Sequence, residues 1–196
     1  MLIYLSGAIV EYRHPMLGFM ITPHMGNAQP LGEWWAADNG RFAAPEKYTD
    51  VGYIKWLLSM DREHALFATA PDVLGDHKAT IELSRPIFPW IRRAGYRPAF
   101  VAQDGWCEQT TPWDEFDVLF IGGSNEFKLG LGLEASRAAN DRRKWVHMGR
   151  VNSLKRLLIA RRAGCHSADG TYLKYGPKIN WPRMCRWFDA LAIDKK

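Results

Sequence analysis

The sequence has little cysteine and no long apolar run. Among its 196 residues there are three cysteines, Cys107, Cys165 and Cys185, and no two of them form a Cys-x-x-Cys pair. This spacing argues against a disulfide framework and against a cysteine-rich zinc site, so we expect reduced thiols, no metal and no cofactor. No stretch approaches the length of a membrane span and no signal peptide is evident. We therefore expect a cytoplasmic protein without membrane contact.

The charge balance is basic. The chain carries 26 Lys and Arg residues against 21 Asp and Glu residues, a formal net charge of +5. A basic surface can displace counterions from a phosphate backbone, which makes nucleic acid a candidate partner. Many of the basic residues lie at helical spacing, however, and a solvated helix face accounts for them equally well. The length and the 47% hydrophobic content predict a single globular domain over residues 1–196.

Eight short apolar runs recur along the chain, each closed by small or polar residues. Continuous apolar strands are typical of parallel sheets that are buried on both faces. Helical patterns between most runs predict an α/β fold, a compact (β/α)8 barrel with some helices shortened or missing. An open doubly wound α/β sheet is the alternative. The runs span residues 2–7, 18–23, 33–38, 65–72, 98–105, 118–124, 144–149 and 165–170, and the links between the first three, and between the fifth and sixth, are too short for a crossover helix.

Polar residues close five of these runs. In a barrel, the carboxyl ends of the strands converge on one mouth, so these residues would face one another across a pocket. Aspartate, glutamine and backbone N–H groups together match the hydrogen-bonding edges of guanine or a guanine analogue. Two further carboxylates would remain for chemistry at a glycosidic carbon. The closing residues are Asp38, Asp72, Gln103 with Asp104, Gly122 with Gly123, and Asp169.

Six of the segments resemble, in chain order, motifs of the tRNA-guanine transglycosylases. They are more similar still to short phage and bacterial relatives, the DNA 7-deazaguanine transglycosylases of the DpdA type. The resemblance runs from residue 34 to residue 170 as short motifs, namely AADNGRF, TAPD, FVAQDG, FIGGS, WVHMGRVN and AGCHSADG. The tRNA enzymes also carry a Cys3His zinc site after the last catalytic strand. Here residues 171–196 contain Cys185 and no histidine, which leaves no such site.

The resemblance implies a role for each strand-end residue. It makes Asp38 the general acid/base and Asp169 the nucleophile. The residues that it places on the base are Phe42 as a stacking aromatic, Asp72 and Gln103 on the base edge, and Gly122 and Gly123 as backbone N–H donors.

The implied enzyme is a glycosyltransferase that exchanges bases. It would replace guanine in DNA with a 7-deazaguanine derivative, such as 7-cyano-7-deazaguanine, through a covalent aspartyl-sugar intermediate. DNA and the free 7-deazaguanine base are the implied partners, with tRNA less favoured because the zinc site is missing. The same resemblance implies a phage or mobile-element origin, hence the host cytoplasm. A tRNA-guanine transglycosylase, a hydrolytic N-glycosidase and a non-catalytic nucleic-acid-binding domain remain as alternatives.

The sequence also predicts a turn, a loop and the environment of the histidines. Asp38-Asn39-Gly40 predicts a tight turn directly after a strand, because Asn and Gly tolerate positive φ. Residues 172–184 predict a loop with aromatic and basic residues. The histidines show no metal spacing and are expected on the surface or in the core; they include His14, His24, His64, His77 and His147.

Overall fold

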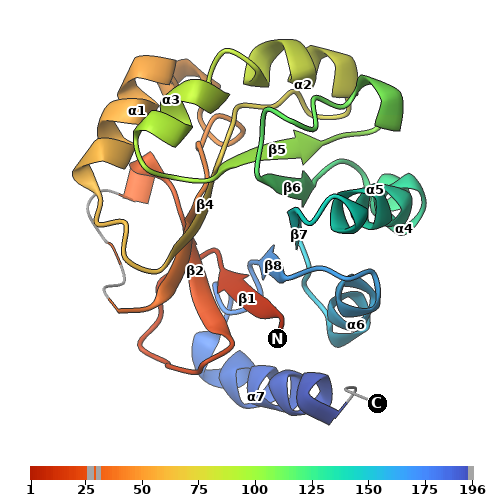
Figure 1. The fold of residues 1–196 in the computed structure, drawn as a ribbon. Helices are drawn as coiled ribbons and strands as arrows, with labels where there is room; N and C mark the ends of the chain where they lie inside the picture. Colours follow the sequence, from red (N-terminus) through yellow and green to blue (C-terminus); the bar gives the residue numbers. More distant parts are fainter. Residues whose placement is uncertain (26–28, 30–31, 194–196) are drawn as a thin grey trace.

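The centre of the molecule is a closed barrel of eight parallel strands (Figure 1). The computed structural model describes residues 1–25, 29 and 32–193. The strands follow one another around the barrel in chain order, and β1 pairs with β8 to close it. The predicted (β/α)8 barrel is thereby confirmed, and the open doubly wound sheet is ruled out. The strands are β1 (Ile3–Ser6), β2 (Leu17–Ile21), β3 (Trp34–Ala37), β4 (Ala65–Thr69), β5 (Pro98–Ala102), β6 (Val118–Ile121), β7 (Trp145–Met148) and β8 (Ser167–Gly170).

The helices are distributed unevenly around the barrel. Every predicted apolar run overlaps one strand, and most helices follow β3 to β8. As predicted, β1 connects to β2 without a helix, and β5 connects to β6 through the short 3-10 turn η3 (Glu108–Thr110) alone. The other elements are α1 (Asp50–Ser59), α2 (His77–Ser84), α3 (Phe88–Arg93), α4 (Asn125–Leu129), α5 (Leu131–Asp141), α6 (Leu154–Arg162) and α7 (Pro177–Ile193), with the 3-10 turns η1 (Pro23–Met25) and η2 (Pro45–Lys47).

Side chains of the strands alternate between the barrel interior and the layer beneath the helices, as the period of two requires. Trp34 packs against the interior cluster. Trp35 is fully buried in the outer layer, and its ring centroid lies 5.7 Å from that of Tyr96. The interior cluster is apolar and comprises Ile3, Leu5, Met20, Ala36, Leu66, Phe67, Ala99 and Val118, with Trp34, Phe120 and Trp145 packed against it. Polar side chains begin above this layer, toward the carboxyl ends of the strands.

The loop predicted over residues 172–184 is wrong in its second half, because α7 begins at Pro177 and continues through Pro182. This helix packs on the side of the barrel where β1 and β2 lack a helix of their own (Figure 1). Phe188 of α7 stacks on His14, with ring centroids 4.5 Å apart. The apolar residues Met184, Phe188 and Leu191 are buried at helical spacing.

Among the described residues, no helix combines the length and the apolar character that a membrane span requires.

Candidate active site

A pocket of about 290 Å³ opens at the carboxyl ends of the strands. Residues of β3 to β8 and of the loops after them line it, so six of the eight strands contribute to its walls. It brings together Asp38, Phe42, Asp72, Gln103, Gly122 and Asp169. Gly123, the remaining residue predicted for the site, lies outside and lines an adjacent hollow with Asp104 and Ser124.

Asp38 enters the pocket from a tight turn after β3. The Gly40 N–H donates to Asp38 Oδ1 at 2.8 Å, and Gly40 has a φ of 73°, which confirms the predicted turn. Asn39 fixes the turn against β4, because its backbone N–H donates to Thr69 Oγ1 at 2.9 Å and its carboxamide donates to the same oxygen at 3.1 Å. The direction of the Asp38 side chain is therefore set by backbone and by a buried neighbouring strand.

The environment of Asp38 favours its protonated form. Burial raises the pKa of Asp38 to about 6, and the charges of Asp169 and Asp72 act in the same direction. The Gly40 N–H, which stabilises the carboxylate, opposes them. A carboxyl group with such a pKa populates both protonation states near neutral pH, which suits a group that first gives and then takes a proton.

Asp169 is held from below by a buried hydrogen-bonded chain. His147 Nε2 lies 3.0 Å from Asp169 Oδ1, and His147 Nδ1 lies 2.9 Å from Ser167 Oγ. Trp145 Nε1–H donates to the same Ser167 Oγ at 2.9 Å. Because Ser167 already accepts from Trp145, its own hydroxyl hydrogen can be donated to His147 Nδ1. That tautomer leaves the Nε2–H of His147 to donate to Asp169.

His147 is a site residue that the sequence did not identify. The histidines were expected on the surface or in the core, and His147 is indeed fully buried in the core. It also contacts the carboxylate of Asp169 in the pocket. Its ring packs against Phe120 and Phe67, with centroids 4.4 and 5.0 Å away, and forms the floor beneath Asp169. Strand alternation alone places His147 on the inward face with Trp145 and Gly149. The pairing of His147 with Ser167, which carries the chain to Asp169, depends on a register that the sequence does not specify.

Gln103 and Asp72 form a pair on another wall. Gln103 Nε2 donates to Asp72 Oδ2 at 2.6 Å, and the Gly75 N–H donates to Gln103 Oε1 at 3.1 Å. Gln103 is only 1% exposed, so both ends of its carboxamide are committed to the protein. Burial raises the pKa of Asp72, and the hydrogen bond from Gln103 opposes that rise. The structure thus shows Gln103 orienting Asp72, while a direct contact of Gln103 with a base stays a prediction.

The backbone of Gly122 does not play the role expected from the sequence. Its N–H donates to the Ala102 carbonyl at 2.9 Å, so the expected donation of this N–H to a base is wrong. The group is already used in continuing the β5–β6 pairing. A Cβ at this position would lie 2.7 Å from Val101 Cγ1 and 3.1 Å from Gln103 Nε2. A side chain here would collide with Val101 and crowd Gln103, which accounts for the glycine.

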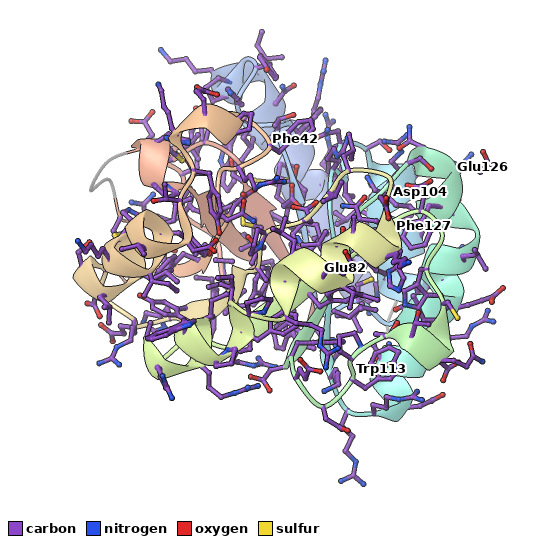
Figure 2. All side chains as sticks on the ribbon, turned by 90° about the horizontal axis from the view of Figure 1, so that it is seen from above. Phe42, Glu82, Asp104, Trp113, Glu126 and Phe127 are labelled. Carbon is purple, nitrogen blue, oxygen red and sulfur yellow. The ribbon has the colours of Figure 1, made fainter. Side chains whose placement is uncertain are left out.

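Phe42 lies at the rim of the pocket and is 73% exposed. The guanidinium of Arg150, from the loop after β7, lies 5.8 Å from the centre of its ring. In Figure 2, Phe42 and Asp104 lie toward one end of the barrel, whereas Trp113 lies toward the other. An exposed aromatic face beside a cationic side chain is a surface on which a nucleobase can stack.

No group of three or more His, Cys, Asp or Glu side chains within the described ranges is arranged to hold a metal ion.

Comparison with known proteins extends to the fold alone. No protein-family model matches the chain, and no curated protein sequence matches it. A chain in a structure of the tryptophan synthase complex from Pyrococcus furiosus is 12% identical, with a TM-score of 0.48 over 72% of this chain and 56% of that one. A second structure of that complex gives 14% identity and a TM-score of 0.49 over 72% and 57%. The present chain spans little more than half the length of these neighbours.

Proposed function

We propose that the pocket catalyses base exchange in DNA, replacing guanine with a 7-deazaguanine derivative such as 7-cyano-7-deazaguanine. The observation that carries this proposal is the presence of two differently held carboxylates in one pocket. Asp38 has a raised pKa and a single backbone donor, whereas Asp169 is oriented by the buried imidazole of His147. Such a pair suits a reaction in which one carboxylate moves a proton and the other forms a bond.

In the first half of the reaction, Asp169 attacks C1′ of a deoxyguanosine that has been flipped out of the duplex. The bond between C1′ and N9 breaks, and its electron pair leaves with guanine. Asp38, in its protonated form, donates the proton that guanine takes up. An ester between Asp169 and the sugar remains.

In the second half, the free 7-deazaguanine base takes the place of guanine. Asp38, now a carboxylate, accepts the N9 proton of the incoming base. The nitrogen attacks C1′, the ester bond breaks, and Asp169 returns to its starting form. Each carboxylate is thereby regenerated, and the cycle needs no external oxidant or reductant.

Base recognition is assigned to the wall that carries Asp72. A carboxylate there can accept hydrogen bonds from the ring N–H and the exocyclic amine of guanine, groups that a 7-deazaguanine shares. Gln103 supports this role because its donated hydrogen bond fixes the orientation of Asp72. Phe42 at the rim offers its exposed ring for stacking.

The test is incubation of the protein with guanine-containing DNA, and separately with tRNA, in the presence of labelled guanine or 7-cyano-7-deazaguanine. Nucleosides are then analysed by mass spectrometry. Label in DNA supports the proposal, and label in tRNA alone would reassign the substrate. Abasic sites without label would indicate a hydrolytic N-glycosidase. If neither nucleic acid changes, a non-catalytic binding domain is the better description.

A further inference from the structure

Lys128 of α4 is a largely buried lysine whose ammonium pairs directly with no carboxylate among the described residues. It is only 5% exposed, an environment in which lysine is rare unless it is paired. Within the described part of the chain, its ammonium makes no hydrogen bond and no ion pair, and the nitrogen itself keeps contact with solvent. Burial and the charge of Arg150 lower the pKa of Lys128 to about 8. Most of this side chain is out of water, so a negatively charged ligand beside the ammonium would stabilise its charged form.

Two arginines surround Lys128 in one small hollow. The hollow lies between α4, the loop after β7 and the first turns of α6, and Lys128, Arg150 and Arg156 line it together. Asp169 and Asp104 are the acidic groups whose charges act on Lys128, and both engage other partners, His147 and Ser124 respectively. The cationic groups therefore outnumber the anionic groups that could neutralise them.

The hollow adjoins the base pocket. Arg150 lines both, and its backbone N–H lies 3.4 Å from Asp169 Oδ2. The hollow itself has a volume of about 10 Å³, which is room for one oxygen atom. A tetrahedral anion would place one oxygen in the hollow and the others at its mouth beside Arg150. Lysine and arginine are the side chains that bind phosphate through charge-assisted hydrogen bonds.

We propose that Lys128, Arg150 and Arg156 form a binding site for a phosphate group of the nucleotide whose base enters the pocket. The placement of the base rests on the proposed function, whereas the anion site rests on the three cations alone. In a nucleotide, the sugar lies between base and phosphate. Arg150 likewise lies between the two parts of the site. Its backbone N–H approaches Asp169, which would attack the sugar, and the residue also lines the hollow that would hold the phosphate.

The phosphate could belong to a nucleic-acid backbone or to a free nucleotide. Isothermal titration calorimetry at one low ionic strength would compare inorganic phosphate, deoxyguanosine, deoxyguanosine monophosphate and a short guanine-containing oligonucleotide. Tighter binding of the oligonucleotide than of the monophosphate assigns the backbone, and the reverse assigns the free nucleotide. Either result supports the site if the charge of Lys128 is required for it.

The deciding variant is Lys128→Met, which removes the charge and keeps an unbranched side chain. We expect deoxyguanosine monophosphate to bind the unaltered protein about tenfold or more tightly than deoxyguanosine does. This advantage, and the binding of inorganic phosphate, should disappear in Lys128→Met. The matched control is Lys155→Met, which removes the same charge from an exposed position on α6 and should retain both. Arg150→Gln, altered at an exposed residue, provides a second test should Lys128→Met fail to fold.

The proposal is overturned if Lys128→Met keeps the phosphate advantage, or if Lys155→Met loses it to the same extent. With Arg150→Gln as the test, an unchanged advantage has the same consequence. Failure of the proposed function would look different. In that case inorganic phosphate would still bind in a manner dependent on Lys128, while neither deoxyguanosine nor its monophosphate would compete with a base in the pocket, and no base exchange would occur.

Discussion

Asp38 and Asp169 line the same pocket but are held by different parts of the barrel. On the β3 side, Asp38 receives a backbone hydrogen bond from Gly40 within its own turn, and burial raises its pKa to about 6. On the β8 side, Asp169 is oriented by His147, which is itself fixed by Ser167. One carboxylate is prepared to change its protonation state, and the other is prepared to keep its position.

The difference indicates how a barrel can divide two tasks between two residues of one type. Proton transfer depends on the pKa, which burial at the end of β3 sets. Bond formation depends on the direction of the carboxylate, which side-chain contacts between β7 and β8 set. The proposed roles follow from this contrast, with Asp169 as nucleophile and Asp38 as acid and base.

The largest effect is expected from Asp169→Asn. An amide cannot form the sugar ester, so guanine exchange should fall by about 10⁴-fold or more. The measurement is the rate at which labelled guanine enters DNA. Asp141→Asn, the same change at an exposed position on α5, is the control and should leave the rate unchanged. Exchange that survives in Asp169→Asn would assign the nucleophile to another residue.

A smaller loss is expected from Asp38→Asn. The variant keeps the acceptor for the Gly40 N–H but cannot transfer a proton, so exchange should slow by about 10²- to 10³-fold. Affinity for the base should change little, and the loss should therefore appear in kcat. If Asp38→Asn abolished exchange as completely as Asp169→Asn, the proposed contrast between the two carboxylates would not hold.

The same variant should be more stable than the unaltered protein at neutral pH. The pKa of Asp38 is about 6 in the folded protein and about 4 in an unfolded chain, so the folded state binds this proton more tightly. The free energy of unfolding should consequently fall as the pH rises from 4 to 6. Asparagine does not ionise and so does not undergo that loss, and Asp38→Asn should gain about 2 to 3 kcal/mol at pH 7 but less than about 0.5 kcal/mol at pH 4. Urea unfolding at both pH values measures it, and an equal difference at both would refute the cause given.

His147 should act through Asp169 as a positioning residue. His147→Phe keeps the ring between Phe67 and Phe120 but removes the hydrogen bond to the carboxylate, so kcat should fall about ten- to a hundredfold with little change in KM. His147→Gln restores an N–H donor and should recover part of the rate. Equal kcat values for His147→Phe and His147→Gln would show that this hydrogen bond does not contribute to the rate.

Much of the fold could be predicted from the sequence because each strand is a separate apolar run. The last helix could not, since Gly176-Pro177 and Pro182 are residues typical of loops. Proline is tolerated at Pro177, where the first helical N–H has no partner within the helix. The apolar spacing of α7 becomes meaningful only when the uncovered side of β1 and β2 is known.

The site was predictable where a residue acts from the end of its own strand. The position of Asp38 or Asp169 at a strand end is a local property, visible in the sequence. The Gly122 N–H, by contrast, is taken by a neighbouring strand, and the approach of His147 to Asp169 depends on the register between β7 and β8. Lys128 shows the same limit, since its burial results from packing between α4 and the loop after β7.

The most direct test of the central claim is to trap and locate the covalent intermediate. The protein would be mixed with a guanine-containing oligonucleotide, quenched in acid, and digested for peptide mass spectrometry. The account predicts a sugar adduct on the peptide that contains Asp169, with guanine released in equal amount. An adduct on Asp38 instead, or exchange of labelled guanine without any adduct, would contradict it.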